Sequence, residues 1–307
     1  MSSMTIQVAA CVDRGFTVPL AAALASLDEA SGEDSVVVHV LHPGLSETIR
    51  DRVTAGLSAI DVEWHTVDDR AVAGAFYSTR LTSASLYRLL LGRLLPADVT
   101  RVLYLDADVV VRSSLAPVYA SDLKGHVVGA VRDAGSPWAA SSYGPDWRQL
   151  GLAPESAYFN SGVLLIDLER WREETVGERC LQLLRSGNPR WGDQDALNVV
   201  LQGRWIELER RWNLQTADIG DYSVAWAHWA SDIEAANNDP AVIHYTEHDK
   251  PWIGGSQHPL AAEWFQALDQ TAWAGWRPRP PLEFRLGSRL WGALRYRYLQ
   301  RRNRLPE

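Results

Sequence analysis

The chain has 307 residues, 46% hydrophobic and 22% charged, so it is long enough to bury a sizeable core and its composition excludes a disordered protein. Its two cysteines, Cys11 and Cys180, are too few for a disulfide framework and lack metal-ligand spacing, which indicates buried thiols in a reducing compartment. The net charge of −8 divides into +7 for residues 277–307 and −15 for the rest, which argues against general nucleic-acid binding.

The amino terminus lacks a basic segment followed by an apolar one, so we expect no secretory signal. No apolar stretch approaches the roughly eighteen residues of a membrane span. The sequence therefore predicts a cytoplasmic protein whose contact with a membrane, if it has one, is peripheral.

Strands and helices alternate along the first part of the chain. Apolar and β-branched runs predict strands at residues 5–11, 36–41 and 62–67. Helical patterns lie between them at 18–30 and 46–57. This alternation is typical of a parallel sheet with right-handed crossovers.

Residues 83–95 form an apolar stretch of helical length around one cation, Arg88, and Pro96 ends it. An arginine among leucines either extends its head group to solvent or faces an anion in the core. The pattern alone leaves both readings open.

The next segment, residues 101–111, has an apolar run that predicts a buried strand, followed by Asp106 and Asp108. Two carboxylates so close repel each other and are costly to desolvate, so a shared cation explains them best. Ligands of open α/β sheets bind outside the carboxyl ends of strands, where this pair lies. A solvated Asp-rich turn is the alternative.

Two further strands are predicted at 126–131 and 158–167, with a long irregular loop at 134–157 between them. The second strand contains Gly162 among apolar residues. A glycine there indicates either a bulge or a ligand close to the backbone.

The last third of the predicted domain holds helices at 168–185 and 260–273 and a short strand at 242–245. Asp193 precedes another helix and is either an N-cap or a site residue. The strand carries His244, a structural residue or a ligand. A Pro-rich break near residue 275 divides the chain into a domain, 1–275, and a basic tail, 276–307. The tail pattern predicts an amphipathic helix that either binds a membrane surface or packs on its own domain.

Taken in order, several of these motifs resemble glycosyltransferase family 8, the retaining enzymes that include glycogenin and the bacterial lipopolysaccharide galactosyltransferases. The likeness covers most of residues 5–273. Each motif is weak alone, and their occurrence in one order is specific. The motifs are Val12-Asp13-Arg14-Gly15-Phe16, the helix around Arg88, Leu103-Tyr104-Leu105-Asp106-Ala107-Asp108, Phe159-Asn160-Ser161-Gly162-Val163, Gly192-Asp193-Gln194-Asp195, and His244-Tyr245 followed by Lys250-Pro251-Trp252.

The resemblance implies an α/β fold of the GT-A nucleotide-diphospho-sugar transferase type, with a mixed, mostly parallel central sheet flanked by helices. The implied activity is transfer of a hexose, glucose or galactose, from a UDP-sugar to a hydroxyl of a glycan, lipid-linked or other acceptor. A divalent metal, Mn²⁺ with Mg²⁺ as the alternative, would be bound by Asp106, Asp108 and His244. Two carboxylates and one imidazole suit manganese better than magnesium.

By the same resemblance, the other motif residues contact the donor. The implied catalytic pair is Asp193 and Gln194, and since an amide is a poor nucleophile we favour front-face attack over a covalent intermediate. Lys250 would neutralise charge on the departing UDP. The remaining expected donor contacts are Asp13 to uracil, Arg88 to phosphate or sugar, Asp106 through the metal, Asn160 and Ser161 to the sugar, and Asp133 to donor or acceptor.

Two positions depart from the family pattern. Glu247 replaces a glycine near the diphosphate, where an added carboxylate opposes binding unless it points away or pairs with a cation, and Gly15 replaces an asparagine. Two alternatives to a glycosyltransferase are considered. One is a non-catalytic protein that binds nucleotide sugars, and the other is a haloacid-dehalogenase-like phosphatase, whose Asp-x-Asp motif normally follows the first strand rather than a later one.

Overall fold

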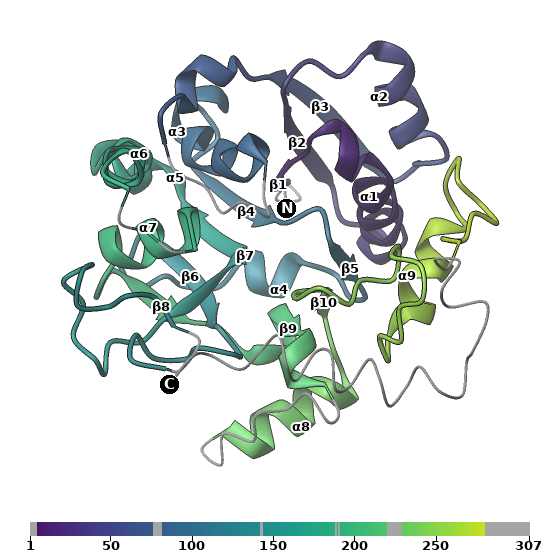
Figure 1. Ribbon diagram of the computed structural model, residues 1–307. Helices are drawn as coiled ribbons and strands as arrows, with labels where there is room; N and C mark the ends of the chain where they lie inside the picture. Colours follow the sequence, from purple (N-terminus) through teal and green to yellow (C-terminus); the bar gives the residue numbers. More distant parts are fainter. Residues whose placement is uncertain are drawn as a thin grey trace.

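In the computed structural model the protein is built on a central sheet with helices on both faces (Figure 1). None of the helices within the described residues has the length and apolar character needed to cross a membrane. The tail predicted at 276–307 lies almost wholly outside those residues. The structure describes residues 5–75, 82–141, 144–187, 189, 191–219 and 229–279.

Within the part of the chain that the structure describes, the large sheet has seven strands in the order β3-β2-β1-β4-β7-β6-β8. Only β7 is antiparallel to its neighbours, and the other pairs are parallel. This confirms the mixed, mostly parallel sheet that we expected. The strands are β1 (Ile6–Cys11), β2 (Val36–His42), β3 (Ile60–Thr66), β4 (Arg101–Leu105), β6 (Val128–Arg132), β7 (Phe159–Asp167) and β8 (Trp205–Glu207).

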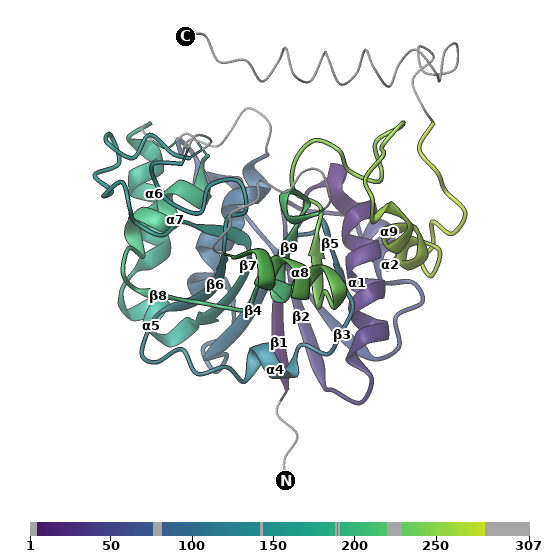
Figure 2. The same cartoon turned by 90° about the horizontal axis from the view of Figure 1, so that it is seen from below.

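Helices cover both faces because side chains of each strand alternate between two cores. In β1, Val8 belongs to the core beneath α1, whereas Ala9 belongs to the core beneath α6 and α7. Figure 2 shows α1 and α2 on one side of the sheet and α5, α6 and α7 on the other. The helices are α1 (Thr17–Ser31), α2 (Glu47–Thr54), α3 (Leu91–Leu94), α4 (Ala116–Tyr119), α5 (Leu168–Glu173), α6 (Val176–Arg185), α7 (Asp193–Val200), α8 (Ala230–Asn238) and α9 (Ala261–Leu268).

A small second sheet carries the later part of the chain back to the carboxyl end of β4. It has the order β5-β10-β9, with β5 (Val109–Val111), β10 (Val242–His244) and β9 (Leu214–Gln215). The antiparallel β5–β10 register sets His244 opposite Val109, directly after the turn that contains Asp106 and Asp108. Two segments far apart in sequence therefore meet at this turn.

Two predicted helices differ from the structure. Residues 83–90 form a 3₁₀ helix, η3, and only Leu91–Leu94 continue as α-helix. The predicted helix 168–185 is two helices, α5 and α6, broken at Thr175 with φ of 48°. At Gly177 an added Cβ would lie 1.8 Å from the Leu89 carbonyl oxygen, so close packing against η3 fixes the new helix direction.

Candidate active site

Asp106, Asp108 and His244 converge at the carboxyl end of β4. His244 Nε2 lies 3.3 Å from Asp108 Oδ1 and 3.7 Å from Asp106 Oδ2. The three possible ligand atoms lie within 4.8 Å of one another. The acids thus face one point together with an imidazole, and the reading as an ordinary solvated turn is wrong.

Side chains around His244 hold its ring in place. Asn213 Oδ1 lies 3.0 Å from His244 Nδ1, and Asn213 Nδ2 donates to Asn160 Oδ1 over 3.0 Å. When Nδ1–H donates to this amide, Nε2 keeps a free lone pair toward the two carboxylates. A metal-binding histidine is fixed in this way, so the donor set fits a divalent cation.

Close packing around Gly162 explains why β7 has a glycine at this position. A Cβ at this position would lie 2.1 Å from His244 Cε1 and 2.7 Å from Asp106 Oδ2. Any larger residue would push two of the candidate ligands away. The register of β6 and β7 shifts between Ala130 and Arg132, opposite residues 160–163, so the bulge that the sequence offered as one reading is found here.

Lys250 is the cation next to Asp108. Its Nζ lies 2.6 Å from Asp108 Oδ2 and also donates to the Tyr245 carbonyl oxygen. Burial alone would raise the pKa of Asp108, but Lys250 and His244 outweigh it and hold the pKa well below its usual range. Asp108 is therefore a carboxylate at any physiological pH.

Arg88 faces anions inside the protein and does not extend to solvent. Only 5% of its surface is exposed, and its guanidinium lies 2.8 Å from Asp106 Oδ1 and 3.0 Å from Asp193 Oδ2. It also stacks over the Tyr104 ring and donates to the Ser161 carbonyl oxygen over 2.7 Å. Although burial lowers the pKa of Arg88, its two acidic partners raise it above the usual value, so the guanidinium stays charged.

Asp193 is the first residue of α7, and the N-cap is Gly192, so the reading of Asp193 as an N-cap is wrong. The side chain is buried, and its Oδ2 faces Arg88 without a well-directed hydrogen bond. Burial raises the pKa of Asp193 to about 6 despite Arg88, and the charge of Asp106 adds to this rise. The site thus contains a carboxyl group that titrates close to neutral pH.

Gln194 is fixed at both ends of its amide. Its Oε1 accepts from the Ser161 backbone over 3.1 Å, and its Nε2 donates to Asp133 Oδ2 over 3.2 Å. Asn160 Nδ2 reaches the same Asp133 oxygen over 3.2 Å. These contacts join the polar residues Asn160 and Ser161 of β7 to the start of α7.

The structure thus brings together ten of the eleven residues that the sequence nominates. Asp13 stands apart at the carboxyl end of β1, where its carboxylate accepts from the backbone of Gly15 and Phe16 and from the Thr82 hydroxyl. Contacts link the others into one network, which consists of Arg88, Asp106, Asp108, Asp133, Asn160, Ser161, Asp193, Gln194, His244 and Lys250.

Two further residues contact this network and were not nominated from the sequence. Tyr104 donates to Asp106 Oδ1 over 2.7 Å, and Asn213 holds His244. Tyr104 stands in an apolar strand and reads as core, and no periodicity marks Asn213. The only signal was the position of Tyr104, two residues before Asp106 and hence on the same face of the strand.

Comparison with known proteins identifies the family. A family model described as glycosyl transferase family 8 matches residues 7–254. The chain belongs to this family. Among curated relatives, General stress protein A of Bacillus subtilis (strain 168) is 26% identical over 282 residues, which cover 87% of this chain and 94% of that protein. The match favours a glycosyltransferase over the phosphatase alternative.

Other family relatives carry names that state an activity. Lipopolysaccharide 1,2-glucosyltransferase of Escherichia coli (strain K12) is 31% identical over 207 residues, which cover 66% of this chain and 59% of that protein. The chain spans 42% of the length of glycosyltransferase GlyF of Streptococcus pneumoniae, at 33% identity. Such relatives are longer than the region they share with this chain.

Solved structures agree with the fold. The galactosyltransferase LgtC, in complex with donor and acceptor sugar analogs, is 27% identical with a TM-score of 0.73, and the match covers 92% of this chain and 99% of that one. The protein therefore has the GT-A-type α/β fold that the family resemblance implied.

Proposed function

We propose that the protein is a metal-dependent, retaining hexosyltransferase. It moves glucose or galactose from a UDP-sugar to a hydroxyl of a glycan, lipid-linked or other acceptor. The observation that carries this proposal is the convergence of Asp106, Asp108 and His244 beside Lys250. The names of the lipopolysaccharide relatives and the sugar analogs named with LgtC support the substrate class.

Mn²⁺, or Mg²⁺ as the alternative, would be held by Asp106, Asp108 and His244. A bound divalent ion supplies positive charge that makes the nucleoside diphosphate a better leaving group. Lys250, 2.6 Å from Asp108, adds a second positive charge next to the same place. Departure of UDP leaves an oxocarbenium-like sugar, so stabilising the leaving group matters more than a strong base.

Asp193 and Gln194 would position the donor sugar. The Gln194 amide is a poor nucleophile, and both of its ends already have hydrogen-bond partners. We therefore favour front-face attack, in which the acceptor hydroxyl enters from the side that UDP leaves. Gln194 contacts Ser161 and Asp133, and Asn160 contacts Asp133. These three neighbours would line the sugar.

The nucleotide and acceptor ends of the site follow from the resemblance and from charge. Asp13, at the end of the strand next to β4, would recognise uracil. The nine arginines and two glutamates of residues 277–307 suggest an anionic partner, so contact with the inner face of an anionic membrane stays a prediction. No nucleic acid is expected as a partner.

A panel of UDP-sugars tests the proposal. With Mn²⁺ present, we expect hydrolysis or transfer from a UDP-hexose, loss of this activity in EDTA, and recovery when Mn²⁺ is added back in excess. Released UDP gives the measurement. Tight binding of UDP-sugars without turnover for any acceptor would instead identify a non-catalytic binding protein, and release of phosphate from sugar phosphates would identify a phosphatase.

The Glu247→Gly variant is expected to be more stable than the natural chain and to bind UDP more tightly. Glu247 is exposed and its φ is 68°, a left-handed conformation that glycine adopts without strain. We expect the free energy of unfolding to rise by about 0.5–1 kcal/mol after the entropy cost of glycine is subtracted. Removing the exposed carboxylate should tighten UDP binding about two- to fivefold.

Lys124→Gly is the matched control, because Lys124 is exposed with φ of 50° and lies outside the network around Asp106. It should gain similar stability in urea unfolding and leave the dissociation constant of UDP unchanged. Equal UDP affinity in Glu247→Gly and in the natural chain would show that the carboxylate points away from the diphosphate.

A further inference from the structure

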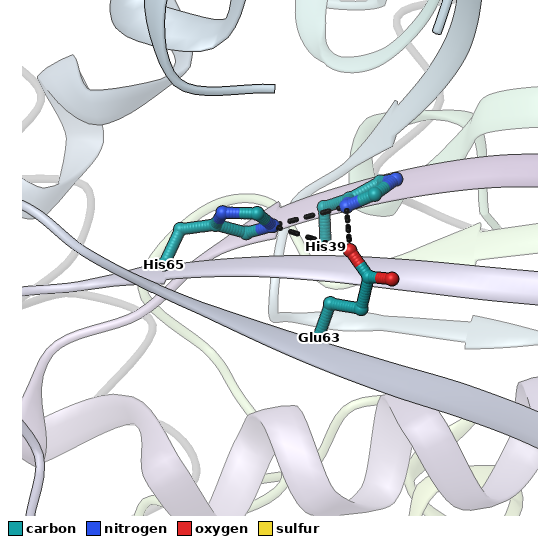
Figure 3. Close-up of side chains that lie close together, drawn as sticks. All are labelled: His39, Glu63 and His65. Atoms are coloured by element: carbon teal, nitrogen blue, oxygen red, sulfur yellow. Dashed lines mark hydrogen bonds and ion pairs between the residues drawn. The ribbon is translucent and has the colours of Figure 1, made fainter. Parts of the chain in front are cut away.

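A second group of possible ligands lies on the edge of the large sheet, away from the strands that build the candidate active site. His39 of β2 stands opposite Glu63 of β3 in the parallel register, and His65 follows two residues later on the same face. Figure 3 shows the three side chains turned toward one another. The edge strand β3 therefore supplies two ligands and its neighbour β2 the third.

The spacing of the ligand atoms matches a tetrahedral metal. His39 Nδ1 lies 3.0 Å from His65 Nε2 and 3.2 Å from Glu63 Oε2, and His65 Nε2 lies 3.9 Å from Glu63 Oε2. Ligands about 2.0–2.1 Å from a tetrahedral Zn²⁺ are separated by about 3.3–3.4 Å. The three observed separations bracket this value.

The hydrogen bonds of His39 argue for a cation at the common point. Its Nε2 lies 2.8 Å from Gln7 Oε1, so the ring donates Nε2–H to this amide and directs the Nδ1 lone pair at Glu63 and His65. The His39 Nδ1 lone pair then faces the Glu63 carboxylate at 3.2 Å. Without a cation, a proton on His65 Nε2 would be the one donor for both of these acceptors. Metal-bound histidines carry an acceptor on the far nitrogen in the same way.

Burial of the three groups suits a site that an ion can enter. The His39 side chain is 2% exposed, the His65 side chain 19%, and the Glu63 side chain 53%. An ion can therefore reach the buried His39 past the exposed Glu63 carboxylate.

We propose that His39, Glu63 and His65 form a zinc site with water as the fourth ligand, which ties the edge strand β3 to β2. Two imidazoles and one carboxylate suit Zn²⁺, whereas Asp106, Asp108 and His244 offer the harder set with one imidazole. The His39, Glu63 and His65 set is therefore the softer of the two. Gln7 is the positioning residue of the zinc site.

Zinc titration calorimetry of the full chain tests the proposal in the Asp108→Asn background, which removes a ligand from the other cluster. We expect one bound Zn²⁺ in this background, and at least a hundredfold weaker binding when Glu63→Gln and His65→Gln are added. The two added changes replace an exposed carboxylate and a partly exposed imidazole by amides. His126→Gln, a partly exposed histidine outside both clusters, is the matched control and should bind zinc as before.

Two further measurements separate a metal site from a hydrogen-bonded cluster. Gln7→Ala keeps all three ligands and should weaken zinc binding about tenfold or more, with little change of Tm in EDTA. Saturating Zn²⁺ should raise Tm by about 3 °C in the background protein and in His126→Gln, but not in the doubly substituted chain. Unchanged zinc affinity on loss of Glu63 and His65, or no zinc binding in the Asp108→Asn background, would overturn the proposal.

Discussion

Replacing Asp108 by asparagine is expected to lower kcat/KM for transfer from a UDP-hexose by about a thousandfold or more, the effect of losing several kcal/mol of charge stabilisation. The variant removes the charge of one of the two proposed carboxylate ligands, and Lys250 then faces a neutral amide. An amide is a far weaker ligand for Mn²⁺ than a carboxylate. UDP release at saturating Mn²⁺ and in a Mn²⁺ titration gives the measurement.

The fold should survive the Asp108→Asn change. The asparagine oxygen still accepts from Lys250, whose side chain is 18% exposed and so keeps access to water. Asp61→Asn, an exposed acid of β3, is the matched control and should retain full activity. A folded Asp108→Asn protein with the activity of the Asp61 variant would refute the proposed metal ligands.

The sequence was sufficient to predict the arrangement of the strands that carry the acids. Continuous apolar runs at β1, β2 and β4 indicate strands buried on both faces, and parallel strands end at one edge of the sheet. Asp13 and Asp106 follow β1 and β4, so their placement at this edge was predictable. The order of the motifs supplied the family.

The contacts that complete the site could not be predicted from local pattern. β5, β9 and β10 have two or three residues each, too few for any periodicity, and their pairing brings His244 and Asn213 beside the acids. The zinc ligands show the same limit. The sequence marks strands there, but only the β2–β3 register sets His39 opposite Glu63.

Helix boundaries failed where tertiary contacts decide the backbone. An apolar stretch of helical length at 83–95 fits a 3₁₀ or an α-helix, and the structure has mostly the former, in which Arg88 Nε donates to the Ser85 carbonyl oxygen over 3.1 Å. The break at Thr175 depends on the packing of Gly177 against Leu89. The packing of Gly177 against Leu89 joins residues far apart in sequence, so no local pattern reveals it.

Replacing Arg88 by methionine is expected to reduce the free energy of unfolding by about 3–5 kcal/mol, the usual result of leaving a buried charge without its partner. Arg88 is 5% exposed and serves both Asp106 and Asp193, so methionine leaves two carboxylates uncompensated. Urea unfolding followed by tryptophan fluorescence at pH 8 measures the loss. Arg88→Lys keeps the charge without the planar fork and should lose less.

The loss in Arg88→Met should also depend on pH, because Asp193 titrates. Its pKa in the folded protein is already raised to about 6 by burial, and removing Arg88 takes away the charge that lowers it. A carboxyl group whose folded pKa exceeds its unfolded value stabilises the protein below the unfolded pKa and loses this contribution as pH rises through the folded pKa. The variant should therefore lose less stability at pH 5, where Asp193 is protonated, than at pH 8.

The double variant Arg88→Met/Asp193→Asn tests this cause directly. Asparagine at position 193 is neutral at every pH, so the double variant should be more stable than Arg88→Met at pH 8, and its loss should be nearly the same at pH 5 and pH 8. Asp193→Asn alone gives the fourth corner of the cycle. An equal loss for Arg88→Met at the two pH values would mean that Asp193 is not the buried charge that Arg88 neutralises, and the role of this arginine as the counter-ion at the start of α7 would have to be abandoned.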